Sequence, residues 1–170
     1  MNDAGHGGVF ALTGSFTIPL DLTAPPEQVW RLFAELPLRR TWVRMPGPSS
    51  TVTHELDFRA GGEERLSNTF VSGDIREHLQ NRTTFLDIVP NERIISTYTA
   101  VVAGSLRWVS LVTVDLTAAG GGTRLGWTEQ YSFANLGTPD GSDDVKHLVG
   151  GTRLRLNGLV AACSALDRGV

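Results

Sequence analysis

Cysteine is almost absent from this chain of 170 residues, which contains only Cys163. A single thiol cannot form an intramolecular disulfide, so the packing of the core must hold the fold together. Val160, Ala161 and Ala162 precede Cys163, an apolar setting without a cation that would activate a thiolate. We therefore expect Cys163 to be a small buried side chain and not a nucleophile.

Long hydrophobic runs and clusters of basic residues are missing too. No apolar stretch approaches the ~20 residues of a membrane-spanning helix, so membrane insertion is not expected. The net charge is -3 and the 15 Lys and Arg residues are scattered, which argues against nucleic acid as a partner. The first residues contain Asp3 and no Lys or Arg, unlike a signal peptide. We predict a cytoplasmic protein with a flexible tail at residues 1–14 and a single domain at residues 15–170.

The common motifs for metals, phosphates and nucleotides are also absent. The four histidines lie far apart in the sequence and no HExxH pattern occurs, so neither a metal nor another cofactor is predicted. There is no GxSxG nucleophile motif, phosphate loop or dinucleotide fingerprint. Gly120–Gly122 is interpreted as a hairpin turn, because no helix follows it to bind a phosphate.

The hydrophobic fraction of 41% is enough for a core, and its spacing predicts the elements. Residues 15–22 are short, apolar and β-branched, which predicts a first strand. The segment TAPPEQVWRLF predicts a helix that starts at Thr23 or Ala24 and ends before Pro37. Residues 38–43 form a second short helix in this interpretation.

Strand patterns dominate the middle of the chain. In residues 51–58, the side chains of Val52, His54, Leu56 and Phe58 alternate with polar ones. Turn signals separate the further predicted strands, which cover residues 63–70, 83–89, 93–102, 106–116 and 123–133. Residues 144–166 then predict one long helix, with an apolar face of residues repeated at three- and four-residue steps.

This order of elements predicts an α+β fold. A curved antiparallel sheet of about six to seven strands wraps around the long C-terminal helix, and two short helices follow the first strand. The sheet must cover its apolar face, and the final helix carries the only long apolar stripe available. Where helix and sheet do not meet, a cavity should remain.

Several short motifs resemble the START-like (SRPBCC, Bet v 1-type) superfamily, and within it the homologues of the activator of Hsp90 ATPase. The matching pieces, spread over roughly residues 15–167, are APPEQVW at 24–30, Trp42, DFRAGG at 57–62, DIVPNERIISTY at 87–98, GGGTRLGWTEQ at 120–130 and the final helix. The resemblance implies a helix-grip fold with a hydrophobic cavity between the sheet and the C-terminal helix. Many relatives carry Gly-Trp early in that helix, whereas Thr152 follows Gly151 here, so this cavity should be roomier.

Candidate ligand-binding residues are the aromatic side chains on predicted inner faces and two residues of the final helix. Such aromatic side chains also serve as core fillers, and that alternative stays open. The candidates are Trp42, Phe58, Tyr98, Trp108, Trp127, Tyr131, Thr152 and Leu156.

His54 and Glu129 are polar residues at otherwise apolar inner positions, which makes them tentative catalytic candidates. If both faced the cavity, they could bind a polar group or transfer a proton. The structural alternative pairs Glu129 with Arg153 or Arg155 and leaves His54 bonded to backbone.

Three functions are compatible with the sequence. The first is binding of a small hydrophobic or aromatic molecule, lipid- or polyketide-like, in the cavity. The second is an enzyme similar to polyketide cyclases, aromatases or lyases that uses the same cavity. The third is a protein-interaction or stress-related chaperone-partner module, for which a homodimer is one possible form.

Overall fold

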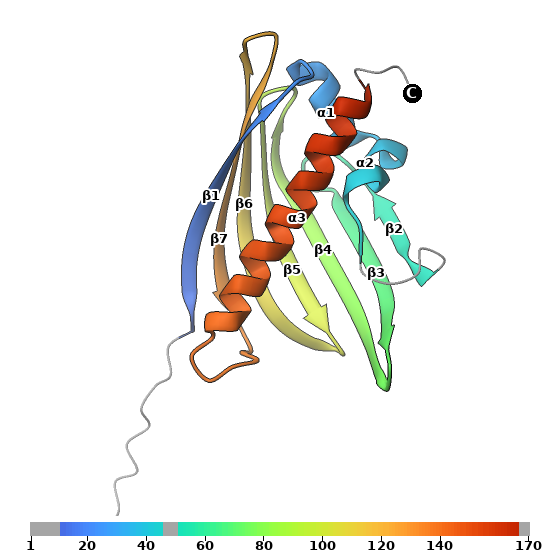
Figure 1. Cartoon of the computed structure of the whole chain (residues 1–170), viewed down its shortest axis with the longest axis vertical. Coiled ribbons are helices and arrows are strands. Elements are labelled where there is room, and N and C mark those ends of the chain that lie inside the picture. Colours follow the sequence, from blue (N-terminus) through green and yellow to red (C-terminus); the bar gives the residue numbers. More distant parts are fainter. Residues whose placement is uncertain (1–10, 46–50, 167–170) are drawn as a thin grey trace, which may run out of the picture.

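Seven antiparallel strands form one curved sheet in the computed structural model, which describes residues 11–45 and 51–166 (Figure 1). The strand order is β1-β7-β6-β5-β4-β3-β2, so the first strand closes against the last, and β1 and β2 are the two edges. The strands are β1 (Thr13–Leu22), β2 (Thr53–Leu56), β3 (Glu63–Ser72), β4 (Ile75–Val89), β5 (Arg93–Val102), β6 (Ser105–Ala119) and β7 (Gly122–Phe133).

Three helices complete the fold: α1 (Pro26–Ala34), α2 (Leu36–Trp42) and α3 (Ser142–Leu166). The long helix α3 lies across the concave side of the sheet, as Figure 1 shows, and α1 and α2 lie near its C-terminal end. The predicted α+β helix-grip fold is therefore confirmed. No helix in the described ranges has the length and apolar character needed to cross a membrane.

The boundaries of the short helices differ from the prediction. α1 begins at Pro26, and the break falls at Glu35, whose backbone is extended. Pro37 lies in the first turn of α2 and does not end α1. A proline fits there because the first residues of a helix need no N–H donor, so the same residue that predicted a stop serves as a start.

Two strands begin two or more residues before the start that their sequence patterns indicate. β1 begins at Thr13, so the predicted tail is already part of the sheet there, while residues 1–10 lie outside the described residues. β4 begins at Ile75, eight residues before the predicted start. Its first half, REHLQNR, is almost entirely polar, so the alternation that marks a strand is missing from it.

Alternation does identify the buried face in the other strands. Ile94, Ser96, Tyr98 and Ala100 of β5 are buried, and so are Leu125, Trp127 and Glu129 of β7. On α3 the buried side chains include Leu148, Thr152, Leu156, Leu159 and Cys163, as the apolar stripe predicts.

The backbone of α3 does not follow the sheet evenly. Its closest backbone approaches are to α2, α1 and β1. The middle strands curve away beneath the helix (Figure 1), and side chains from both layers reach into the space between them.

Both edges of the sheet carry features that affect strand pairing. The edge strand β2 is short, and the guanidinium of Arg40 in α2 donates a 2.9 Å hydrogen bond to the backbone carbonyl of His54. The other edge strand, β1, contains Pro19, which is paired with Gly126 of β7.

Candidate functional site

A cavity of about 1020 Å³ lies between α3 and the inner face of β4–β7, next to α2. Exposed side chains, among them Thr41, Arg44, His147, Leu154 and Asn157, form its rim. The buried walls come from the strands and helices together: Phe33, Arg39, Trp42, Thr83, Phe85, Ile94, Ser96, Tyr98, Ala100, Val112, Val114, Trp127, Glu129, Leu148 and Thr152.

Aromatic rings supply much of the apolar lining. Trp108 packs against Tyr98 at 6.4 Å between ring centroids, and Trp42 packs edge-on against Phe33 at 5.0 Å. The indole N–H of Trp42 donates to the backbone carbonyl of Leu32, which fixes the ring on α1. Aromatic rings therefore form the wall of the cavity at two places, one on β5 and β6 and one on α1 and α2.

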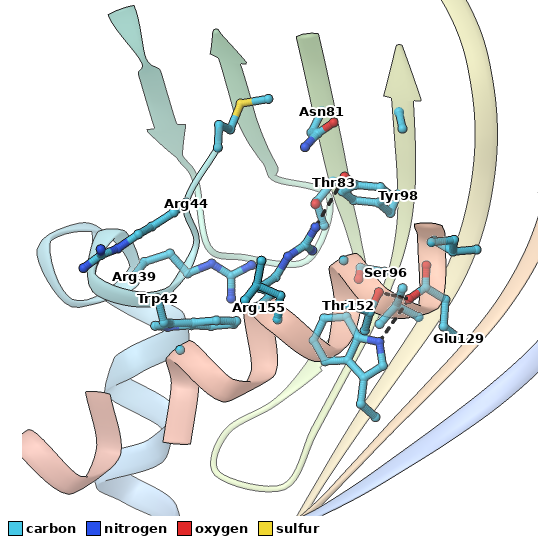
Figure 2. A pocket seen from close by; sticks show the side chains of 18 of the residues that line it. Arg39, Trp42, Arg44, Asn81, Thr83, Ser96, Tyr98, Glu129, Thr152 and Arg155 are labelled. Atoms are coloured by element: carbon cyan, nitrogen blue, oxygen red, sulfur yellow. Dashed lines mark hydrogen bonds between the residues drawn. The ribbon is translucent and has the colours of Figure 1, made fainter. Parts of the chain in front are cut away.

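Glu129 of β7 is a buried carboxylate held by three uncharged donors, of which Figure 2 labels Thr152. The hydroxyl of Ser110 donates to Oε1 at 2.6 Å, while the indole N–H of Trp127 and the hydroxyl of Thr152 donate to Oε2 at 3.2 and 3.1 Å. Arg153 and Arg155, the partners considered from the sequence, do not form salt bridges with it. The carboxylate is satisfied by hydrogen bonds instead of by a neighbouring cation.

Arg155 extends from α3 toward Tyr98 and Thr83 of the sheet (Figure 2). One guanidinium nitrogen lies 3.4 Å from the hydroxyl oxygen of Tyr98, and the guanidinium carbon lies 5.2 Å from the centre of the Tyr98 ring. Burial lowers the pKa of Arg155, but Tyr98 and the charges of Glu129 and Glu64 outweigh this effect and raise the pKa above its usual value. Burial is the main cause that raises the pKa of Tyr98, so at neutral pH Arg155 is a cation and Tyr98 a neutral phenol.

A buried ion network stands beside the cavity. Arg39 of α2 forms two hydrogen bonds of 2.8 and 2.6 Å with the carboxylate of Glu64 on β3, and Nε2 of His54 lies 2.7 Å from the same carboxylate. Burial raises the pKa of Glu64, but the charge and hydrogen bonds of Arg39 and the hydrogen bond of His54 lower it to about 2. The Arg39 guanidinium also lies over the Trp42 ring at 4.5 Å, which connects the network to the aromatic wall.

Residues 23–162 match the family model described as "Activator of Hsp90 ATPase homolog 1-like protein". The chain belongs to this family. The match confirms the resemblance that the sequence motifs indicate.

Solved structures of similar proteins agree with the family assignment. The Mll3558 protein from Rhizobium loti is 33% identical, with a TM-score of 0.75 over 90% of this chain and 99% of that one. A protein from Rhizobium leguminosarum is 29% identical, with a TM-score of 0.78 over 92% and 97%. CalU16 from Micromonospora echinospora shares the fold at 20% identity, with a TM-score of 0.57 over 94% and 88%. No curated protein matches the chain.

Within this Hsp90-activator-like domain, the candidate residues from the sequence fall into two groups. Six of them line the cavity: Trp42, Tyr98, Trp108, Trp127, Glu129 and Thr152. The other four, Phe58, Tyr131, Leu156 and His54, are not among the lining residues.

Packing explains the position of the second group. Phe58 contacts Trp30 and Phe85, and Tyr131 contacts Phe16 and Phe133. Leu156 is fully buried on the face of α3 that packs against the hydrophobic core. His54 interacts with Glu64, so it does not share a site with Glu129.

Sequence reasoning missed Arg39 and Glu64 as members of a buried network. Glu64, Leu66 and Asn68 are alternate residues of β3 and lie on the same face of the strand, where all three are buried. Alternation could therefore have identified Glu64 as an inner residue. Nothing local indicates that its partner is Arg39, because the two are 25 residues apart in the sequence.

Proposed function

We propose that the protein binds a small hydrophobic or aromatic molecule, lipid- or polyketide-like, in the cavity between the sheet and α3. The main support is the volume of about 1020 Å³, which lies at the upper end of the roughly 300–1,000 Å³ typical of small-molecule sites. The lining combines aromatic walls with a few fixed polar groups, and such groups orient a ligand.

The two other candidate functions have weaker support. An enzyme similar to cyclases or lyases would have Glu129 in its cavity, but His54, the proposed second acid–base group, is bonded to Glu64 outside it. An interaction module would be favoured by a filled interior and a continuous exposed apolar patch. Here the interior is hollow. The large exposed apolar side chains among the described residues are spread over β3, β4, β6, α3 and the loop before α3: Val71, Leu86, Leu106, Leu111, Leu136 and Leu154.

A substitution that fills the cavity tests the proposal. Thr152 is buried on α3 and lines the cavity, so Thr152→Trp places an indole ring in the space a ligand needs. We expect the affinity for Nile red, an uncharged apolar dye, to fall by about tenfold, equivalent to roughly 1.4 kcal/mol. Fluorescence titration measures the affinity, and circular dichroism checks that the variant is folded.

Thr152→Val is the matched control. It removes the hydroxyl that donates to Glu129 but keeps the size of the side chain, so dye affinity should stay close to that of the wild type. Equal dye affinity in wild type and a folded Thr152→Trp variant, or no dye binding by the wild type, would contradict the proposal.

A further inference from the structure

We propose that the ligand of this cavity is an organic anion, with an apolar body against the aromatic walls and a carboxylate held by Arg155 and Tyr98. This inference rests on the proposed function, because it names the chemical class of the ligand in the same cavity.

The two carboxylates beside the cavity already have several hydrogen-bond donors. The Glu129 carboxylate receives hydrogen bonds from Ser110, Trp127 and Thr152. The Glu64 carboxylate, behind Arg39, receives three more from Arg39 and His54. Three of the roughly four lone-pair positions of each carboxylate are thus filled, which leaves little for a cationic ligand to bind.

Hydrogen-bond donors, in contrast, are left over around Tyr98. Arg155 has five N–H donors, and its one side-chain contact is the long 3.4 Å hydrogen bond to Tyr98. In the described part of the chain no carboxylate lies within salt-bridge distance of Arg155. The Tyr98 oxygen accepts that bond, so its own O–H remains available as a donor.

Trp108 adds an aromatic wall beside this pair. Its ring lies 6.4 Å from the Tyr98 ring and lines the cavity. Over residues 11–45 and 51–166, its indole nitrogen is the buried side-chain donor that reaches no acceptor. This nitrogen is shielded from solvent and cavity alike, so Trp108 offers a ligand its apolar ring and not a hydrogen bond.

The charges around the cavity also favour an anion. Its charged lining residues are Arg39, Arg44, Arg155 and Glu129, and Arg39 is neutralised by Glu64. Arg44 at the exposed rim and Arg155 inside remain against the single charge of Glu129. A planar guanidinium matches the two oxygens of a carboxylate, which makes a carboxylic acid the best-fitting anion.

Three probes of equal shape and different charge test the inference: 2-naphthoate, 2-naphthamide and 2-(aminomethyl)naphthalene. Isothermal titration calorimetry at neutral pH compares their affinities for the wild-type protein. A hydrogen bond between charged partners increases affinity by about 10- to 100-fold. We therefore expect naphthoate to bind at least about tenfold more tightly than naphthamide. The positively charged amine should bind most weakly.

Arg155→Met keeps an apolar side chain of similar length without the guanidinium. It should lower the affinity for naphthoate much more than that for naphthamide, whose neutral carbonyl forms a weaker hydrogen bond, so the preference for naphthoate disappears. Arg153→Met is the matched control, because Arg153 is exposed on the same helix and does not line the cavity.

The outcomes separate this inference from the proposed function. A preference for naphthoate that disappears in Arg155→Met but not in Arg153→Met supports the inference. If Nile red binds but naphthoate shows no preference over the amide, or the amine binds most tightly, the inference fails and the proposed function stands. If neither Nile red nor any naphthalene compound binds, both fail. The wild-type comparison of probes decides the question even if Arg155→Met does not fold.

Discussion

The buried glutamates Glu64 and Glu129 have very different surroundings. Those surroundings give the two carboxylates different chemical roles. Glu64 is neutralised by Arg39 and is fully engaged by its neighbours, whereas Glu129 has only uncharged donors around it. The first arrangement binds α2 to the sheet. The second places a carboxylate in the wall of a cavity, where a ligand senses its charge.

Glu129→Gln should fold normally and change ligand selectivity. A glutamine can keep its oxygen toward Trp127 and Thr152 and turn its amide group toward Ser110, whose hydroxyl can accept a hydrogen bond. Because the change removes a negative charge from the cavity wall, naphthoate affinity should rise by about two- to tenfold. Calorimetric titration gives the affinity and a melting curve the stability.

Glu129→Ala is the informative contrast, because it leaves the three donors without an acceptor. We expect it to lose roughly 2–5 kcal/mol of stability. A melting temperature of Glu129→Gln as low as that of Glu129→Ala, with unaltered probe binding, would make Glu129 a purely structural residue.

Glu64 should make stability depend on pH in the acidic range. Its pKa is about 2 in the folded protein against an ordinary 4.5, so the unfolded chain binds a proton first as the pH falls. The stabilisation is fully present above 4.5 and is lost as the pH falls from 4.5 to about 2, with a total of roughly 3 kcal/mol.

Urea denaturation of the wild type and Glu64→Gln between pH 7 and about pH 3 measures this effect. At neutral pH the variant should be about 3–5 kcal/mol less stable, because Arg39 is left buried without its counter-charge. The difference between the two proteins should shrink as the pH falls. Glu55→Gln, an exposed change on β2, should give a curve parallel to that of the wild type at every pH.

At the scale of elements, α3 combines a packed face with a cavity wall. Leu156, Leu159 and Cys163 are buried in the core, while Thr152 and Arg155 on the same helix line the cavity. Gly158 explains part of how the helix fits, because a Cβ there would lie 3.2 Å from the backbone oxygen of Trp42 at the end of α2. Close packing of α3 on α2 therefore sets one end of the cavity.

Leu156→Ala tests the packed face. Leu156 is 1% exposed, and truncating a buried leucine costs about 2–5 kcal/mol. Leu154→Ala, two residues away with an exposure of 75%, should change stability by less than about 0.5 kcal/mol. Chemical denaturation of both variants measures the difference, and equal stabilities would contradict the assignment of this face to the core.

Elements with strong periodicity could be predicted from the sequence, and elements without it could not. The boundaries of β5 agree with the predicted strand, because its alternation is regular, while the polar first half of β4 was missed. Alternation also identified His54 and Glu129 as inner residues, and both are buried. It could not indicate their separation, because β2 and β7 have four strands between them in the sheet. The empty volume depends on how far the sheet curves from α3, which no local pattern encodes.

At the scale of the whole molecule, the two edges of the sheet limit how copies of the protein can associate. An added strand would need free backbone donors and acceptors along β1 or β2. Arg40 already occupies the carbonyl of His54 on β2, and Pro19 has no N–H to offer on β1. Growth into a continuous intermolecular sheet, the route to fibrils, is therefore disfavoured at both ends, and any homodimer should form through helices or loops. The same helix α2 that borders the cavity thus also makes the β2 edge a poorer template for an added strand.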